Sequence, residues 1–275
     1  MKNLLSMKTP VLALFISLVA FGACVSNKQT QPSTDYTQLV NPFIGTDFTG
    51  NTYPGAQAPF GMVQLSPDNG LPGWDRISGY FYPDSTIAGF SHTHLSGTGA
   101  GDLYISFMPV TLPYQEAEAP LGIYSKFSHA DEEASAGYYR VLLKDYDINV
   151  ELTATERCGI QRYTFPEGES AVFLNLKKAM NWDFTNDSYI EIIDSCTIQG
   201  YRFSEGWARD QHVYFRTRFS KPFASVEMDT TAIALKGKRV GTAYIARFNF
   251  DTEKGEQIVL STALSGVSME GAAKN

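Results

Sequence analysis

The segment Ile148-Asn149-Val150-Glu151-Leu152-Thr153-Ala154 alternates apolar and polar side chains residue by residue. Because successive side chains of a β-strand point to opposite faces, this alternation is typical of a strand with one buried face. The same period of two recurs in residues 212–219, where Val213, Phe215 and Phe219 share one face. These two segments predict strands of a sheet that buries one side.

Runs of the same kind continue along the chain and are bounded by turn residues. They cover residues 139–143, 160–165, 171–176, 190–193, 197–201, 232–235, 244–250 and 258–264, with turns expected at Gly168, Asn186-Asp187, Gly237 and Gly255. No sustained helical stripe precedes residues 268–275, where Ser268 is placed to cap the start of a helix. Many short strands with regular turns predict an all-β fold, a large antiparallel β-sandwich.

The N-terminus has the features of an export signal. Lys2 and Lys8 precede an apolar run over residues 11–21, which is shorter than the roughly 20 apolar residues needed to span a bilayer. The small residues Gly22 and Ala23 then precede Cys24, as in a bacterial lipobox. We therefore expect residues 1–23 to be a lipoprotein signal peptide and Cys24 to be lipidated, with the protein in the periplasm or at the cell surface; the alternative is simple secretion with an incidental Cys24.

The remaining chain divides by composition. Residues 24–38 are polar and are expected to form a flexible tether, and residues 39–275 are long enough for one large domain. The net charge is -7 with 22 Lys+Arg and no basic cluster, which argues against nucleic acid and favours a neutral or modestly polar ligand. Cys158 and Cys196 lie outside any CxxC motif, so a disulfide and two buried thiols in adjacent strands both stay open.

Residues 41–109 are rich in Gly, Pro, aromatic residues and His, a composition that suits loops shaped around a ligand. His92 and His94 are two residues apart and would share one side of a strand, where both could reach a ligand or metal. Asp102 is the nearby carboxylate for such a metal. Ligand hydrogen bonding, metal binding and a structural role are the three readings of this pair.

Trp74 and Asp75 lie in a loop rich in Gly and Pro. An indole ring at a loop tip can stack on a sugar ring, although it can equally cap the sandwich edge. Glycoside hydrolysis needs two carboxylates that flank the scissile bond, and the spacing of the candidates singles out no such pair. The candidates are Asp47, Asp68, Asp75 and Asp102. We assign no catalytic residue and no metal ligand within this chain.

Several motifs in a fixed order resemble the N-terminal part of glycoside hydrolase family 92, the calcium-dependent exo-acting α-mannosidases. The resemblance runs from about Tyr36 to the C-terminus, and its segments are Val40-Asn41-Pro42-Phe43-Ile44-Gly45-Thr46, Tyr53-Pro54-Gly55-Ala56, residues 59–68, Ser78-Gly79-Tyr80, residues 89–97 and Gly206-Trp207-Ala208.

The resemblance implies an N-terminal β-sandwich that packs on a catalytic (α/α)6 barrel, with hydrolysis by inversion. The general acid, the general base and the main Ca²⁺ ligands belong to that barrel, which residues 39–275 do not include. The implied substrate is a mannose-containing glycan such as an N-glycan, cleaved by an α-1,2-mannosidase-like activity. The sandwich is expected to contribute substrate-binding residues, namely Gly55, Trp74, Asp75, His92, His94 and Gly97.

Three other readings remain. A stand-alone carbohydrate-binding lipoprotein would bind mannose as an isolated module. A non-functional gene fragment would be followed by a frameshift or stop and then by the barrel. An intact small enzyme would need an acid and base pair within this chain, using Asp75 or Asp102. The resemblance favours an N-terminal domain that is inactive alone and that works with the catalytic barrel and a membrane anchor.

Overall fold

The computed structural model describes residues 35–94, 105–177, 183–206, 208–235 and 238–275. Two units are distinguished, Met1–Asp35 and Tyr36–Asn275, and the fold below is that of the second. Within the described ranges, no helix has the length and apolar character needed to span a membrane.

An eight-stranded antiparallel sheet contains the strand that the opening segment predicts, β9. In spatial order its strands are β12 (Phe184–Asp194), β13 (Thr197–Glu205), β14 (Gln211–Phe219), β17 (Glu256–Ser265), β10 (Cys158–Phe165), β9 (Ile148–Ala154), β8 (Tyr138–Leu143) and β7 (Glu132–Ser135). Burial alternates along β8, β9 and β10, as the period of two requires for a sheet with one core face.

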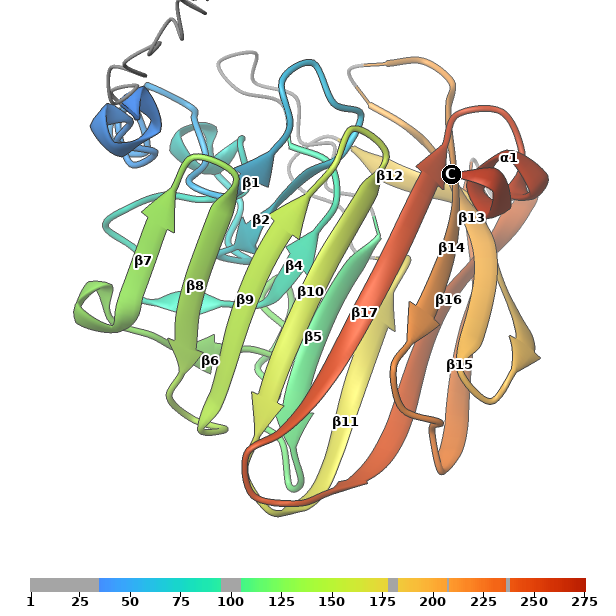
Figure 1. Cartoon of the computed structure of the whole chain (residues 1–275). Helices are drawn as coiled ribbons and strands as arrows, with labels where there is room; N and C mark the ends of the chain where they lie inside the picture. Colours follow the sequence, from blue (N-terminus) through green and yellow to red (C-terminus); the bar gives the residue numbers. More distant parts are fainter. Residues whose placement is uncertain (1–34, 95–104, 178–182, 207, 236–237) are drawn as a thin grey trace, which may run out of the picture. The chain divides into compact units, whose positions relative to one another are not determined.

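A seven-stranded antiparallel sheet covers the other side of the core, and Figure 1 shows the two large sheets lying one behind the other. Its spatial order is β1 (Ala56–Gln57), β2 (Gln64–Asp68), β4 (Gly89–Ser91), β5 (Ser106–Thr111), β11 (Gly168–Asn175), β16 (Lys238–Thr252) and β15 (Ser225–Leu235). A small third sheet pairs β3 (Thr86–Ile87) with β6 (Ser125–Lys126).

Aromatic side chains join the two large sheets across the core. The Phe219 ring of β14 lies 6.4 Å from Phe107 of β5, 5.1 Å from Phe248 and 6.0 Å from Phe250 of β16, measured between ring centroids. All four rings are at most 2% exposed. Burial of these rings contributes to the stability of the sandwich at its centre.

Short helical segments complete the fold. Three 3-10 turns, η1 (Tyr36–Leu39), η2 (Trp74–Arg76) and η3 (His129–Asp131), lie in the connections, and α1 (Met269–Lys274) lies at the C-terminus. The Ser268 hydroxyl accepts from the Gly271 N–H at 3.0 Å, which confirms the predicted cap. The all-β sandwich with a terminal helix is therefore confirmed.

Two local expectations need correction. The turn expected at Asn186-Asp187 is wrong, because both residues lie inside β12, where the pairing register shifts between Thr185 and Asp187 as in a β-bulge. The two cysteines are free thiols and are half-buried, with Cys158 at the start of β10 and Cys196 in the turn between β12 and β13. They therefore do not lie in adjacent strands as two buried thiols.

Candidate functional site

The loop between β2 and β3 presents Trp74 to solvent. The Trp74 side chain is 58% exposed at the start of η2, and Asp75 beside it is half-buried. Arg76, the last residue of η2, donates through Nε and Nη2 to the Asp84 carboxylate at 2.6 and 2.5 Å, and its guanidinium lies 4.6 Å from the centre of the Phe81 ring. This bidentate pair and its cation–π contact hold the tip of the loop.

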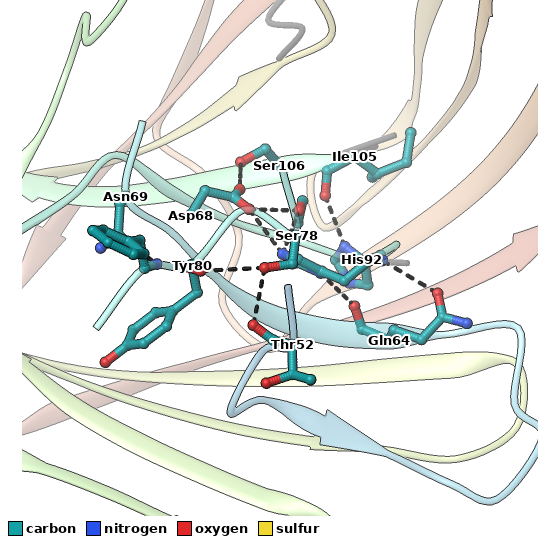
Figure 2. A network of polar contacts seen from close by, with 12 residues as sticks. Thr52, Gln64, Asp68, Asn69, Ser78, Tyr80, His92, Ile105 and Ser106 are labelled. Carbon is teal, nitrogen blue, oxygen red and sulfur yellow. Dashed lines mark hydrogen bonds and ion pairs between the residues drawn. The ribbon is translucent and has the colours of Figure 1, made fainter. Parts of the chain in front are cut away.

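Side-chain hydrogen bonds close the base of the same loop. The Asn69 side chain donates to Thr86 O at 2.7 Å and accepts from Phe81 N–H at 2.5 Å. The Ser78 hydroxyl lies between Thr52 O at 2.9 Å and Tyr80 O at 3.2 Å, as Figure 2 shows. The backbone that carries Trp74 is therefore fixed at several points, which preorganises the exposed ring.

Gly55 allows the chain to pass close to β2. A Cβ at this position would lie 2.1 Å from Leu65 O and 2.4 Å from the Ser66 Cβ. Such a distance is far inside van der Waals contact, so only glycine fits without displacement of the backbone. The structure thus gives Gly55 a packing role, and its predicted contact with substrate stays a prediction.

His92 lies inside the sandwich in its neutral form. The ring is 0% exposed, its Nδ1–H donates to Ile105 O at 2.7 Å, and its Nε2 lies 3.4 Å from the Gln161 side-chain nitrogen. The Gln161 amide oxygen in turn accepts from the Tyr163 hydroxyl. Burial lowers the pKa of His92 from 6.5 to about 4, since the charged ring would lose its hydration. Figure 2 shows His92 against Ile105.

His94 forms a different network, with Asp68 at the end of β2. Its ring is 1% exposed, its Nδ1–H donates to Gln64 O at 2.8 Å, and its Nε2 lies 2.9 Å from Asp68 Oδ1. The Asp68 carboxylate also accepts from the hydroxyls of Ser91 at 2.9 Å and Ser106 at 3.1 Å. The Asp68 carboxylate thus has three side-chain partners inside the protein, from His94, Ser91 and Ser106, so its burial is compensated by hydrogen bonds.

The two histidines therefore do not share one side of a strand. β4 ends at Ser91, before either histidine, and the two rings contact different partners. Both are almost completely buried, so a ligand would reach them only after their neighbours moved. Their contact with substrate stays a prediction, as does that of Trp74 and Asp75. Gly97, Asp102 and Cys24 lie outside the described residues.

A second buried carboxylate joins the loop layer to the edge of the eight-stranded sheet. Glu132, whose side chain is 1% exposed, accepts from Tyr80 Oη at 2.9 Å, Tyr139 Oη at 2.6 Å and His129 Nδ1 at 2.6 Å. His129 also donates through Nε2 to Tyr82 O at 2.7 Å and stacks on the Tyr82 ring at 3.9 Å. Burial and the Glu132 charge raise the pKa of both tyrosines, which keeps them as donors.

Sequence reasoning missed both carboxylate clusters. It grouped Asp68 with three other carboxylates without singling it out, although Asp68 is the last residue of β2 and is 1% exposed. Glu132 pairs with residues up to 52 positions away along the chain, and no local pattern marks such a cluster. Buried carboxylates need partners from distant strands, which only the fold brings together.

Metal ligation was considered for the residues that the structure describes. Among the residues that the structure describes, no three His, Cys, Asp or Glu side chains lie together as metal ligands need to. Asp68, one of the four candidate carboxylates, is committed to hydrogen bonds inside the protein.

Comparison with known proteins places these observations in a family. The model of the glycosyl hydrolase family 92 N-terminal domain matches residues 39–265. A GH92 α-mannosidase from Bacteroides thetaiotaomicron, solved in complex with mannoimidazole, is 36% identical with a TM-score of 0.79, and the match covers 87% of this chain and 33% of that one. An inverting GH92 mannosidase from the same organism is 28% identical with a TM-score of 0.71, over 87% and 33% of the two chains.

A curated relative extends the comparison to a fungus. An uncharacterized secreted glycosidase of Arthroderma benhamiae is 29% identical over 160 residues, which cover 56% of this chain and 20% of that protein. The chain thus spans about a third of the solved relatives and a fifth of the curated one. Because the family model matches most of residues 39–275, this chain belongs to glycosyl hydrolase family 92, of which it contains the N-terminal domain.

Proposed function

We propose that this chain is the N-terminal sandwich of an inverting, calcium-dependent exo-α-mannosidase of the α-1,2-mannosidase type, which acts on mannose-containing glycans such as N-glycans. One observation carries the proposal. A solved GH92 α-mannosidase shares the fold over 87% of this chain at 36% identity, and the match covers only 33% of the length of that enzyme. In this proposal the work of the whole enzyme is divided between this domain and a catalytic barrel.

In this proposal the sandwich supplies one wall of the sugar pocket. Trp74 offers an exposed aromatic ring on a loop that the Arg76–Asp84 pair holds, and such a ring can pack against the apolar face of a sugar. Other large apolar side chains are exposed as well, among them Phe48 at 80% and Phe60 at 104%. Exposed apolar side chains of this size suit an interface with a second domain, so the chain alone should be prone to association.

The domain should be inactive alone. Inversion requires a general acid and a general base on opposite sides of the glycosidic bond, with room for a water molecule. The proposal assigns both groups, and the calcium ligands, to the barrel. The purified chain should therefore release no mannose from an α-1,2-linked mannobiose with or without added Ca²⁺. Release that is abolished by Asp75→Asn or Asp102→Asn would instead establish a small complete enzyme.

Trp74 provides the test of the sugar wall. The matching domain of the Bacteroides thetaiotaomicron α-mannosidase is replaced by residues 39–265, and kcat/KM is compared between Trp74 and Trp74→Ala fusions. We expect a loss equivalent to roughly 1–3 kcal/mol, the value of an aromatic contact in the transition state. Met228→Ala, at a side chain that is 43% exposed on β15, is the matched control and should leave kcat/KM unchanged. A fusion in which Trp74→Ala unfolds the domain but leaves kcat/KM per folded molecule intact would assign Trp74 to packing.

We further propose export and anchoring through lipid on Cys24, at the periplasmic or outer face of a membrane. Support comes from the signal-like residues 1–23, and one family relative is described as secreted. Several acyl chains on one cysteine hold a protein firmly to a bilayer. Mass spectrometry of the mature N-terminus should find acylated Cys24. An unmodified Cys24, or a start at another residue, would rule out the anchor.

A further inference from the structure

The outer face of the seven-stranded sheet carries a groove of about 530 Å³. Its floor is formed by Met108 of β5, Phe173 of β11 and Ile245 of β16, on strands that are neighbours in the sheet. These side chains point away from the core between the two large sheets, because their strand neighbours, such as Phe107 and Phe248, fill that core. The volume is within the range of small-molecule sites, about 300–1,000 Å³.

One wall of the groove is a hairpin over residues 114–123, which the rest of the fold holds in place. The Tyr146 hydroxyl accepts from Gln115 N–H at 3.0 Å and donates to Tyr124 O at 2.8 Å. Ala117 N–H donates to Gly122 O at 3.0 Å. The Tyr114 ring of this hairpin meets Phe173 edge to face at 5.1 Å. The groove is therefore preformed, which lowers the entropic cost of binding.

The rim combines hydrogen-bonding groups of both charges. Glu116 stands on the hairpin, Lys177 follows β11 and Asp229 lies on β15, and all three residues are exposed. Within the described part of the chain, the carboxylates of Glu116 and Asp229 form no ion pair, and the Lys177 ammonium lies 3.4 Å from the Thr231 hydroxyl. Two carboxylate acceptors and one ammonium donor thus surround an apolar floor that includes the Phe173 ring, beside a wall that carries the Tyr114 ring.

This combination favours a neutral, polyhydroxylated ligand. Two carboxylates against one ammonium repel a phosphate or another anion. A purely apolar ligand would leave the polar rim groups without partners as it displaced their water. A sugar ring presents C–H groups for Tyr114 and Phe173 and hydroxyls for Glu116, Lys177 and Asp229.

We propose that this groove is a second saccharide-binding site, separate from the Trp74 loop. The identity of the sugar as an α-mannoside rests on the proposed function of the domain. A branched glycan held in the groove by one arm raises the local concentration of its other arms near the enzyme, so weak binding there still increases capture of the substrate.

The test measures binding of α-1,2-mannobiose and of yeast mannan to the chain, by calorimetry for the first and by affinity electrophoresis for the second. Tyr114→Ala and the double variant Glu116→Gln/Asp229→Asn should each weaken binding about tenfold, since each removes one side of the site. Tyr36→Ala, at a ring that is 72% exposed, is the matched control and should bind as the parent chain does.

The outcomes separate the two sites. If the groove variants weaken saccharide binding and Trp74→Ala does not, the result supports the saccharide site in the groove. Weakening by Trp74→Ala alone overturns the groove and leaves the proposed function intact. Absence of binding by the parent chain also overturns the groove, while the proposed function, which needs the barrel, stands. If Tyr114→Ala fails to fold, the double variant decides, because its exposed side chains contribute little to stability.

Discussion

Acidification tests the neutral state assigned to His92. The buried ring has its pKa lowered from 6.5 to about 4, chiefly because desolvation penalises the imidazolium. Between these two values the unfolded chain binds more protons than the folded chain, so the free energy of unfolding falls as the pH falls. The contribution of His92 is complete above pH 6.5 and is lost as the pH approaches 4. Each pKa unit is worth about 1.4 kcal/mol, which gives a loss of about 2 kcal/mol between pH 7.5 and pH 5.

The assay is urea unfolding of the chain at these two pH values, followed by far-UV circular dichroism. His92→Asn keeps an amide N–H near the position of Nδ1 and removes the titratable ring. Its free energy of unfolding should therefore fall by about 2 kcal/mol less between pH 7.5 and pH 5 than that of the parent chain. His212→Asn is the matched control, because the His212 side chain is 42% exposed beside Asp210. This variant should lose as much free energy of unfolding between pH 7.5 and pH 5 as the parent chain does. Equal losses for the parent and His92→Asn would refute the assignment of a neutral, buried His92.

Three further predictions follow from individual contacts. Asp68→Asn replaces one acceptor oxygen of a buried network that His94, Ser91 and Ser106 contact, and should lower the free energy of unfolding by about 1–3 kcal/mol, whereas an unchanged free energy of unfolding would mean that the network does not stabilise the fold. Gly55→Ala places a methyl group against Leu65 O and should cost about 1–3 kcal/mol in the same measurement, while Gly266→Ala, where a Cβ meets nothing within 4 Å, should be nearly neutral. Alkylation without reductant should modify both Cys158 and Cys196, and a mass lower by two hydrogens at this pair would contradict the free thiols.

Periodicity was sufficient for the fold, because the strands are long and have one buried face. Residues 148–154 predicted β9, and Ser268 predicted the cap of α1. The bulge in β12 was misread as a turn because Asn and Asp favour both, and only cross-strand pairing distinguishes them.

The candidate site was less accessible to sequence reasoning. His92 and His94 were predicted to be site residues. Their spacing alone could not show that the strand ends at Ser91, or that the His92 ring lies against Gln161 and the His94 ring against Asp68. The Glu132 cluster and the groove depend on strands distant in sequence, so no local motif marks them. Trp74 was placed in a loop by its Gly and Pro neighbours, and its ring is indeed exposed.

The proposed role of this domain is to complete a family 92 α-mannosidase. The most direct measurement is kcat/KM for release of mannose from α-1,2-mannobiose by the Bacteroides thetaiotaomicron α-mannosidase whose own N-terminal domain has been replaced by residues 39–265. We predict that the fusion hydrolyses the mannoside and that neither this domain nor the remaining enzyme does so alone. A folded fusion with no more activity than the remaining enzyme alone would contradict it.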